Sequence, residues 1–367
     1  MEQHHLMVIS SSIGNGHNQA AKAFISGWEA SGYGSAHFID FLEAQTPPDR
    51  FAQWGYEMMI QHAPWSYEFL YRISDFNLTG SLIRTQCALS MKARLMQLIE
   101  NEDKEIHGLA FTHPSPANAA SWLKKKGQLS LPLAGIVTDF VIHELWADTG
   151  LDLYCVPHEE QADKLIKIGI PSHKIHATGI PISEPFWAPP IPQPQQAKLH
   201  LLIAGGGWGM GPLKEAYQTL ESLSVPCKVT FIAGKNQPLE EEMKNLIGHT
   251  KHDLTVLGYT DKIAEYMESA DLLISKAGGL TTSEALSRGT PLLLLPGRAG
   301  QEEDNAQLIE KHGAAISLHR VKDIPGKIEE LLRTPSSLVS LSENALALGR
   351  PCAAKDSANW MNQLLNS

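Results

Sequence analysis

A histidine and two glycines follow the first short apolar run of the chain. The stretch SSSIGNGHNQAAKAF contains Gly14, Asn15, Gly16 and His17. Glycines let a backbone approach a ligand closely, and the dipole at a helix N-terminus disfavours the protonated form of a histidine. The imidazole of His17 can therefore act as a hydrogen-bond acceptor or a base. A lone histidine is more often structural, and this stretch leaves both interpretations open.

Two other segments of the first half place polar side chains after an apolar run. IVTDFVIHELW supplies Asp139, His143 and Trp146, and FTHPSPAN supplies His113. A carboxylate such as that of Asp139 can deprotonate a hydroxyl group or orient a histidine. The structural alternative for Asp139 is the N-cap of a following helix.

The second half contains the glycine-rich stretch LLIAGGGWGMGP, which includes Gly206 and Gly207. Glycines after a strand let backbone N–H groups approach an anion at the start of a helix. The spacing matches neither a Walker A motif nor a dinucleotide fingerprint, so a flexible turn is an equal alternative.

The run ISKAGGLTTSEALSRG combines a glycine turn with hydroxyl groups. We expect Gly278 and Gly279 to turn the chain and Thr281 or Thr282 to cap a helix, an arrangement suited to a diphosphate. Glu284, expected in the first turn of that helix, could accept both ribose hydroxyls of a nucleotide. The alternative is a capping box formed by Thr281 and Glu284, and both interpretations are compatible.

The next strand end carries PGRAGQEEDNA, with Gln301, Glu302 and Asn305. Their short polar side chains suit sugar hydroxyls, although each alone is typical of a solvated helix start.

All these residues follow apolar runs that we predict to be strands. The predicted strands are 6–9, 37–39, 108–112, 133–137, 153–156, 199–204, 229–233, 254–257, 272–275, 291–295 and 314–318. Helical patterns separate them, for example 82–99, whose apolar residues recur every three or four positions. This alternation predicts an α/β fold with two Rossmann-like doubly wound domains facing across a cleft, with ligands beyond the carboxyl ends of the strands.

A proline-rich stretch separates the two halves. GIPISEPFWAPPIPQPQQAK contains six prolines, which predicts a semi-rigid linker without a helix or a central strand. The predicted boundaries are an N-terminal acceptor-binding domain at 1–180, the linker at 181–198, a C-terminal nucleotide-binding domain at 199–350, and a C-terminal helix at 351–367 that could pack back on the first domain.

Composition excludes several classes of function. The 367 residues carry a net charge of −10, which argues against nucleic acid as a partner. Four widely spaced cysteines indicate reduced, buried thiols. The start lacks a signal peptide, and no apolar run approaches the roughly 20 residues of a membrane span, so we expect a cytoplasmic protein. Metal-ligand motifs and a GxSxG elbow are absent, so we expect no bound metal and no simple hydrolase.

Several motifs together resemble the monogalactosyldiacylglycerol synthase and processive diacylglycerol glucosyltransferase family. They are GNGHNQAA, APWSYEFLYRISD, VTDFVIHELW, VPHEEQADKLIKIGIPSHKIHATGIPI and VLGYTDKIAEYMESADLLISKAGGLTTSEAL, with PGRAGQEEDNA as a lengthened form of the family's PGQEEDNA. The resemblance covers nearly the whole chain.

The resemblance implies a GT-B glycosyltransferase of family 28. Such an enzyme transfers a hexose from a UDP-sugar to a lipid hydroxyl with inversion, giving a β-glycoside without a catalytic metal or cofactor. Asp139 is the first choice for the general base, with His17 second or as its helper. Donor-side positions are Gly206, Gly207, Lys276, Gly278, Gly279, Thr281, Thr282, Glu284, Gln301, Glu302 and Asn305; acceptor-side positions are Gly14, Asn15, Gly16, His113, His143 and Trp146.

The lengthened sugar loop leaves glucose and galactose open. Residues 77–99 count +3 from Arg84, Lys92 and Arg94, and their apolar neighbours suit either an anionic membrane surface or a packed helix. The aromatic segment 54–73 could line a lipid entrance or belong to the core. We therefore expect a peripheral enzyme at the inner face of the cell membrane. The alternatives are a non-lipid acceptor, a silent nucleotide-sugar-binding protein and, less favoured, an epimerase.

Overall fold

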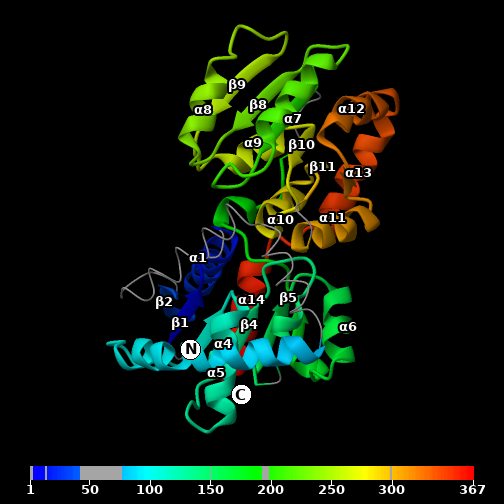
Figure 1. Cartoon of the computed structure of the whole chain (residues 1–367). Helices are drawn as coiled ribbons and strands as arrows, with labels where there is room; N and C mark the ends of the chain where they lie inside the picture. Colours follow the sequence, from blue (N-terminus) through cyan, green and yellow to red (C-terminus); the bar gives the residue numbers. More distant parts are fainter. Residues whose placement is uncertain (1–2, 13–14, 42–76, 149, 192–197, 298–299) are drawn as a thin grey trace. The chain divides into compact units, whose positions relative to one another are not determined.

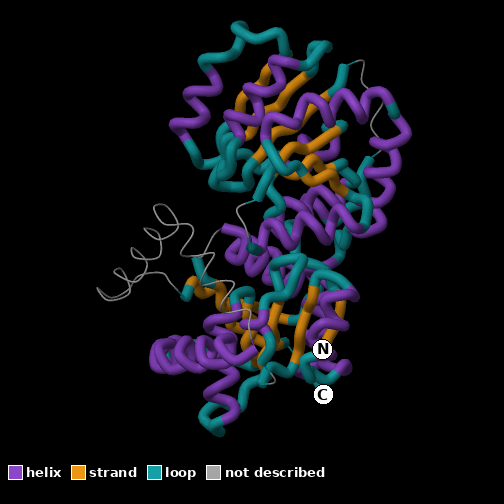
Figure 2. The backbone as a smooth tube through the Cα atoms, turned by 45° about the vertical axis from the view of Figure 1, so that its right-hand side comes forward, coloured by secondary structure: helices purple, strands orange, loops and turns teal. Residues whose placement is uncertain are grey.

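The computed structural model describes residues 3–12, 15–41, 77–148, 150–191, 198–297 and 300–367 (Figure 1). The chain divides into two compact units: unit 1 comprises Met1–Glu184 and Cys352–Ser367, and unit 2 comprises Pro185–Pro351. In each unit a parallel sheet lies among helices (Figure 2). The predicted doubly wound α/β class is confirmed. No described helix combines the length and apolarity that a bilayer crossing requires.

Some predictions concern positions outside the described residues. These are Gly14, the aromatic segment 54–73 and residues 298–299 of the lengthened loop. For Asn15, Arg84 and Cys87 the structure describes the helical backbone but not the side chain.

Unit 1 contains a six-stranded sheet with the order β2-β1-β3-β4-β5-β6 over the described residues. The strands are β1 His4–Ser10, β2 Gly34–Asp40, β3 Gly108–Phe111, β4 Leu133–Ile136, β5 Leu153–Val156 and β6 Ile175–Ala177. The sequence pattern missed β6, because its three residues centre on a histidine and form only a short apolar signal.

The apolar side chains of β1 pack on both faces of this sheet. Met7 and Ile9 pack with α4 Asn77–Glu100, α5 Pro114–Lys125 and α6 Glu159–Lys167. Leu6 and Val8 pack on the other face with α1 Asn15–Ala30 and α14 Ala353–Leu365. Alternate side chains of a strand point to opposite faces, so a continuous apolar run indicates a strand buried on both sides.

The C-terminal helix α14 belongs to unit 1, where it packs along α1 and beside β5 (Figure 1). Gly27 lies at the crossing of the two helices, where an added Cβ would come within 2.6 Å of the Ala354 carbonyl carbon. A buried hydrogen bond of 2.9 Å joins Ser357 Oγ to Thr178 Oγ1. The end of the chain is thus bound to its first half by close packing.

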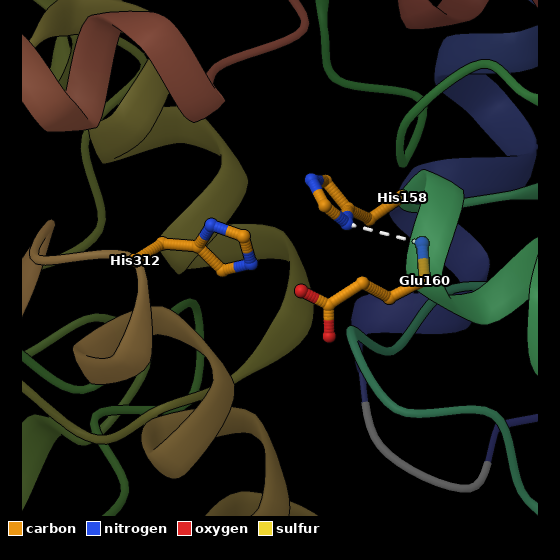
Figure 3. Close-up of side chains that lie close together, drawn as sticks. All are labelled: His158, Glu160 and His312. Atoms are coloured by element: carbon orange, nitrogen blue, oxygen red, sulfur yellow. Dashed lines mark hydrogen bonds between the residues drawn. The ribbon is translucent and has the colours of Figure 1, made fainter.

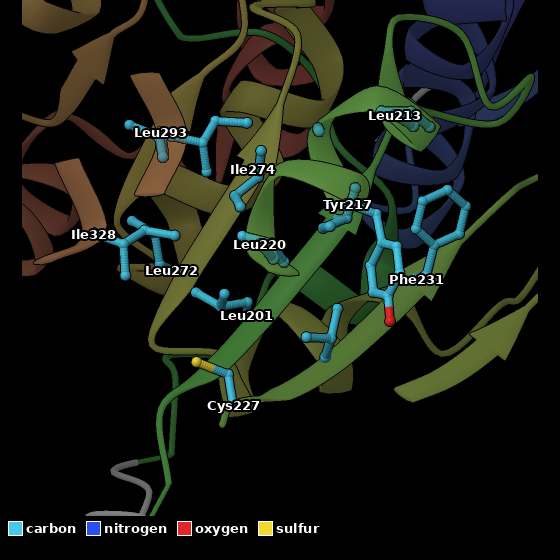
Figure 4. Close-up of a cluster of buried hydrophobic side chains, with 14 of the residues drawn as sticks. Leu201, Leu213, Tyr217, Leu220, Cys227, Phe231, Leu272, Ile274, Leu293 and Ile328 are labelled. Atoms are coloured by element: carbon cyan, nitrogen blue, oxygen red, sulfur yellow. The ribbon is translucent and has the colours of Figure 1, made fainter. Parts of the chain in front are cut away.

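The described part of unit 2 forms a second six-stranded sheet with the order β12-β11-β10-β7-β8-β9. The strands are β7 His200–Ala204, β8 Lys228–Ile232, β9 Asp253–Leu257, β10 Leu272–Ser275, β11 Leu292–Leu294 and β12 Ala315–Ser317. Its helices are α7 Leu213–Thr219, α8 Gln237–Lys244, α9 Ile263–Ser269, α10 Gly279–Arg288, α11 Gln301–Lys311, α12 Ile324–Arg333 and α13 Pro335–Leu348. Figure 4 shows the core in which Leu201, Phe231 and Ile274 of the sheet meet Tyr217 of α7 and Ile328 of α12.

The proline-rich segment contains one short helical turn, the 3₁₀ helix Glu184–Phe186. The prediction of no helix is therefore wrong at these three residues, because the fixed φ of a proline fits a helical first turn. Arg288 of α10 binds this segment through hydrogen bonds to the carbonyls of Pro185 and Ala188, and its guanidinium lies 5.5 Å from the Phe186 ring.

The described cysteines are free thiols. Cys155 and Cys227 are buried as predicted, whereas Cys352 is exposed at the N-cap of α14. The prediction of burial is wrong for Cys352, because a position just before a helix lies outside the apolar faces that the helices cover.

The α1–α14 crossing gives a first test. Gly27→Ala should lower the stability of the protein by about 1–3 kcal/mol, because the added methyl group meets backbone that cannot move away. Gly326→Ala in α12 is the matched control, since its Cβ would meet nothing within 4 Å and alanine favours a helix. Thermal and urea unfolding measure both variants. Equal stability of the two would contradict the close crossing.

Candidate active site

Strand register brings three loops to one edge of unit 1. Ile9 of β1 pairs with Phe111 of β3, and Phe111 pairs with Gly135 of β4. The loops that follow these neighbouring strands carry His17, His113 and Asp139. Parallel strands expose their carboxyl ends at the same edge of the sheet, which explains why segments about 25 and 95 residues apart converge there.

His17 lies in the first turn of α1 and is partly exposed. Its Nδ1 atom lies 3.0 Å from the carbonyl oxygen of Thr112 and 2.6 Å from Thr138 Oγ1. The sequence analysis singled out neither threonine, although each directly precedes a chosen residue at a strand end. The signal in the sequence was a threonine at the end of each apolar run, next to a residue that was already chosen.

Three other histidines of unit 1 serve as helix N-caps. The Nδ1 atoms of His113, His143 and His158 accept hydrogen bonds from the backbone N–H two residues later, at 3.2, 3.1 and 3.3 Å. Figure 3 shows this bond for His158 and Glu160 of α6. These rings satisfy helix donors that lack an intrahelical partner. His17 makes no such cap, which sets it apart from them.

His113 and His17 are brought together, as the strand-end argument expects. Their rings are 5.0 Å apart and meet edge to face at 85°. Burial, with a smaller contribution from His17, holds the pKa of His113 well below its usual value. His113 is therefore a neutral ring, and because its Nδ1 accepts a hydrogen bond, its proton is on Nε2.

Asp139 follows β4 in an irregular segment and is partly exposed. No described helix begins there, so the N-cap alternative for Asp139 is wrong; the following 3₁₀ helix Glu144–Trp146 is capped by His143 instead. Trp146 is buried in the core, where it packs against Gly135. The roles of His143 and Trp146 on the acceptor side stay predictions, and the structure gives both a structural use.

Asp40, at the end of β2, holds both flanks of the glycine–histidine loop. Its carboxylate accepts hydrogen bonds from the backbone N–H of Ser12 at 3.1 Å and from Asn18 Nδ2 at 2.8 Å. Gly16 is in the first turn of α1, where an added Cβ would meet none of the described residues within 4 Å. Packing against the described residues therefore does not demand glycine at this position.

In unit 2 the helix after β10 begins earlier than predicted. Gly278 is the N-cap of α10 and has no side-chain capping bond, so neither Thr281 nor Thr282 caps the helix. Glu284 is beyond the first turn, which also excludes the capping box. The glycine pair lets the chain enter the helix at least three residues sooner, and no side chain of the N-cap accepts from the backbone N–H groups of the first turn.

Glu284 is partly exposed, and desolvation raises the pKa of its carboxyl to about 8. Burial disfavours the charged form of a carboxyl group, so the neutral form of Glu284 is favoured near neutral pH. One turn earlier, the hydroxyl of Thr281 lies 3.5 Å from the position that a Cβ on Gly206 would occupy. The helix and the glycine-rich loop are thus neighbours.

Lys276 follows β10 and forms an ion pair with Glu302 of α11 at 2.6 Å. Its Nζ would lie 3.6 Å from a Cβ at Gly278, so this cation lies beside the start of α10. Asn305, buried on α11, donates to the Ala277 carbonyl at 3.1 Å and holds the same loop. Gln301 is the first residue of α11 and is partly exposed.

The glycine-rich loop folds tightly against the end of β8. Gly206 and Gly209 have φ values of +71° and +60°, and a Cβ at Gly209 would approach the Ala233 carbonyl oxygen to 2.0 Å. The carbonyl of Gly207 accepts a hydrogen bond of 2.9 Å from the Lys235 N–H. The closeness of the Ala233 carbonyl therefore requires glycine at position 209. The sequence pattern alone gave no sign of this contact.

Comparison with known proteins agrees with this architecture. Solved structures with the same fold include MurG of Acinetobacter baumannii (16% identity, TM-score 0.64, 99% of each chain) and a glycosyltransferase of kitacinnamycin (13% identity, TM-score 0.66, 99% of each chain). These likenesses establish the fold, and with it a protein of the GT-B class.

The sequence matches are more specific. Residues 17–182 match the family model for monogalactosyldiacylglycerol (MGDG) synthase, and residues 200–351 match the glycosyltransferase family 28 C-terminal domain. Processive diacylglycerol beta-glucosyltransferases of Bacillus cereus (strain G9842) and Bacillus pumilus (strain SAFR-032) are 28% and 27% identical, over 92% and 94% of this chain and 88% and 90% of theirs. The chain belongs to the monogalactosyldiacylglycerol synthase and processive diacylglycerol glucosyltransferase family, and it is a UDP-sugar-dependent hexosyltransferase.

Glu284 offers a test of the donor side. Glu284→Ala should weaken UDP binding by about 1–3 kcal/mol, the worth of two hydrogen bonds between uncharged groups, because this carboxyl is protonated near neutral pH. Isothermal titration calorimetry measures this, with Glu265→Ala on the exposed face of α9 as the matched control. Unchanged UDP affinity in Glu284→Ala would contradict the ribose assignment.

The pH dependence of stability gives a second test at the same residue. A folded pKa of about 8 lies above the unfolded value of about 4.3, so the folded state binds the extra proton between these values. Stability of the wild type should therefore fall relative to Glu284→Gln as the pH rises from about 5 to 8, and level off above that. Denaturant titrations at a series of pH values measure the difference. A constant difference would show that Glu284 is not desolvated.

Proposed function

We propose that this enzyme transfers a hexose from a UDP-sugar to diacylglycerol or a related lipid alcohol and forms a β-glycoside in glycolipid synthesis. The observation that carries the proposal is the similarity over 92–94% of the chain to relatives named processive diacylglycerol beta-glucosyltransferase. The match of residues 17–182 to the monogalactosyldiacylglycerol synthase model supports it. Glucose and galactose remain alternatives, because residues 298–299 of the lengthened loop lie outside the described residues.

On the donor side we infer that the start of α10 receives the diphosphate. Its first backbone N–H groups and the positive end of its dipole favour an anion, and Lys276 adds a cation beside Gly278. Glu284 would accept the ribose hydroxyls, and Gln301 and Glu302 would contact the sugar. Gly206 and Gly207 of the glycine-rich loop would approach the nucleotide closely.

On the acceptor side we infer that His17 and Asp139 form the catalytic pair. The sequence ranked Asp139 first, whereas the contacts of His17 favour its Nε2 as the proton acceptor. The acceptor hydroxyl oxygen attacks the anomeric carbon, its proton passes to His17, and the bond to the UDP oxygen breaks with the electron pair leaving on the diphosphate. Asp139 would hold the acceptor hydroxyl.

We further propose that this displacement needs no metal. The dipole of α10 and the Lys276 ammonium together would offset the charge that develops on the leaving diphosphate. Activity should therefore persist in excess chelator, and strict dependence on added Mg²⁺ would contradict this part of the proposal.

A membrane surface is the proposed source of the acceptor. In α4, Lys92 lies 4.6 Å from the ring centre of Trp122, and Lys126 lies 5.8 Å from the same ring on its α5 side. Lys124 and Lys125 belong to the same end of α5. The Trp122 ring thus holds the ammonium groups of Lys92 and Lys126 near each other, and anionic headgroups could bind this pair of positive charges.

The catalytic pair gives the central prediction. His17→Gln and Asp139→Asn should each lower kcat about 10²–10⁴-fold, the usual contribution of a general base, and leave the UDP dissociation constant unchanged. Product formation from UDP-glucose and UDP-galactose with diacylglycerol, measured by mass spectrometry, reports the activity. Full activity of His17→Gln would remove His17 as the base and return that role to Asp139.

Flotation with anionic liposomes separates the lipid acceptor from a non-lipid one. We expect the wild type to float, and Lys92→Glu combined with Lys126→Glu to reduce flotation. Lys327→Glu, at a partly exposed side chain of α12 in unit 2, should not reduce it. Absence of binding by the wild type, together with transfer to a soluble alcohol, would favour the non-lipid acceptor. Absence of any transfer or hydrolysis would favour a silent nucleotide-sugar-binding protein.

A further inference from the structure

The arrangement around His17 differs from that around every other histidine contact described above. Two oxygen atoms, the Thr112 carbonyl and Thr138 Oγ1, approach the same ring nitrogen, Nδ1. Among the described residues, Nε2 has no hydrogen-bond partner. Thr112 is fully buried and Thr138 is 6% exposed, so both oxygens belong to the interior of unit 1.

A buried histidine of unit 2 shows the contrasting arrangement. His200 places Nδ1 2.8 Å from the Ser269 carbonyl oxygen and Nε2 2.9 Å from Thr230 Oγ1. The His200 ring therefore also contacts one carbonyl and one threonine hydroxyl, but each contact uses a different ring nitrogen. No ring nitrogen of His200 is left to accept a proton from a substrate. In His17 the same two partner types converge on one nitrogen and leave the other available.

The protonation of His17 follows from the chemistry of its partners. A carbonyl oxygen can only accept, so a 3.0 Å contact with Thr112 requires a proton on Nδ1. If Nδ1 carried the lone pair instead, two acceptors would face each other inside the protein. The Thr138 hydroxyl can accept from the same N–H, and its own proton can be directed to the Thr112 carbonyl 3.5 Å away. In the neutral ring the lone pair is therefore on Nε2.

We propose that Thr138 is a positioning residue for the transfer reaction: with the Thr112 carbonyl it holds Nδ1–H of His17, so that Nε2 presents its lone pair to the acceptor hydroxyl. This inference rests on the proposed function, and it extends that function by naming the groups that prepare the base. Thr138 touches neither substrate; it acts through the imidazole ring.

The same two oxygens serve the step that follows. When Nε2 takes the hydroxyl proton, the ring becomes an imidazolium whose Nδ1–H still donates to Thr112 and Thr138. The positive charge is then shared with two buried acceptors, which compensates for the unfavourable α1 dipole. His113, neutral and edge-on at 5.0 Å, limits rotation of the ring without adding a competing charge.

Three variants of the full chain test the role of Thr138. Thr138→Val keeps the shape and removes the hydroxyl, Thr138→Ser restores a hydroxyl, and Thr230→Val removes the matching hydroxyl beside His200 as the control. We expect Thr138→Val to lower kcat about tenfold, the rate equivalent of one hydrogen bond, with KM for the UDP-sugar unchanged. Thr138→Ser should recover most of that loss, and Thr230→Val should keep the wild-type kcat.

Nitrogen NMR of protein labelled with ¹⁵N-histidine provides a readout that does not depend on transfer. The His17 signals are assigned by their loss in His17→Gln. In the wild type we expect a protonated Nδ1 and an unprotonated Nε2, and in Thr138→Val a shift toward a mixture of the two tautomers. Circular dichroism and thermal unfolding establish that Thr138→Val is folded.

The outcomes separate this inference from the proposed function. The inference would be overturned if the wild-type His17 carried its proton on Nε2. It would also be overturned if Thr138→Val folded and kept the wild-type kcat and tautomer. Either result would count even if the enzyme transfers hexose to lipid. Failure of the wild type to transfer any hexose would overturn the proposed function, while the NMR result would still decide the tautomer. A lower kcat in Thr138→Val with an unchanged tautomer would also count against the inference.

Discussion

When apolar clusters cover both faces of a strand, the polar side chains that could bind or react with a ligand lie at the ends of that strand. In unit 1, alternate side chains of β1 fill two separate apolar clusters, so no polar group can stand along its middle. The order β1-β3-β4 then decides which strand ends are neighbours, and the loops after these three strands carry His17, the Thr112–His113 pair and the Thr138–Asp139 pair. This register brings the carbonyl of Thr112 and the hydroxyl of Thr138 to a single ring nitrogen of His17, the arrangement on which the proposed chemistry rests.

The two units meet different electrostatic needs with the same architecture. Unit 2 offers an anion the start of α10 and the ammonium of Lys276, while Glu284 is a carboxyl that burial keeps protonated near neutral pH. In unit 1, the His113 ring beside His17 is held neutral by burial. Under the proposed function, a nucleotide diphosphate and an uncharged alcohol would make different electrostatic demands on the two units.

The strands and the loops after them were largely predictable from the sequence. A short apolar run that ends at a turn signal such as glycine indicates a strand buried on both faces. The sequence pattern missed β6, whose three residues include a polar centre. It also placed the N-cap of α10 at the threonines, whereas Gly278 holds that position and the helix begins at Gly279. Serine and threonine are common at the N-cap of a helix. A pair of glycines can nevertheless start a helix without a side-chain cap. The partners of His17 were not predictable from the pattern, since Thr112 and Thr138 lie 95 and 121 positions from it and only the strand order joins them.

Helix α14 has a consequence for how the protein comes to be made. Ala358 and Met361 from the last 15 residues complete the apolar cluster that covers one side of the first sheet. These residues follow the whole of the second unit in the chain, whereas α1, which packs in the same cluster, precedes it. During synthesis the second unit, which is continuous in sequence, is therefore made before the helix that completes the core of the first.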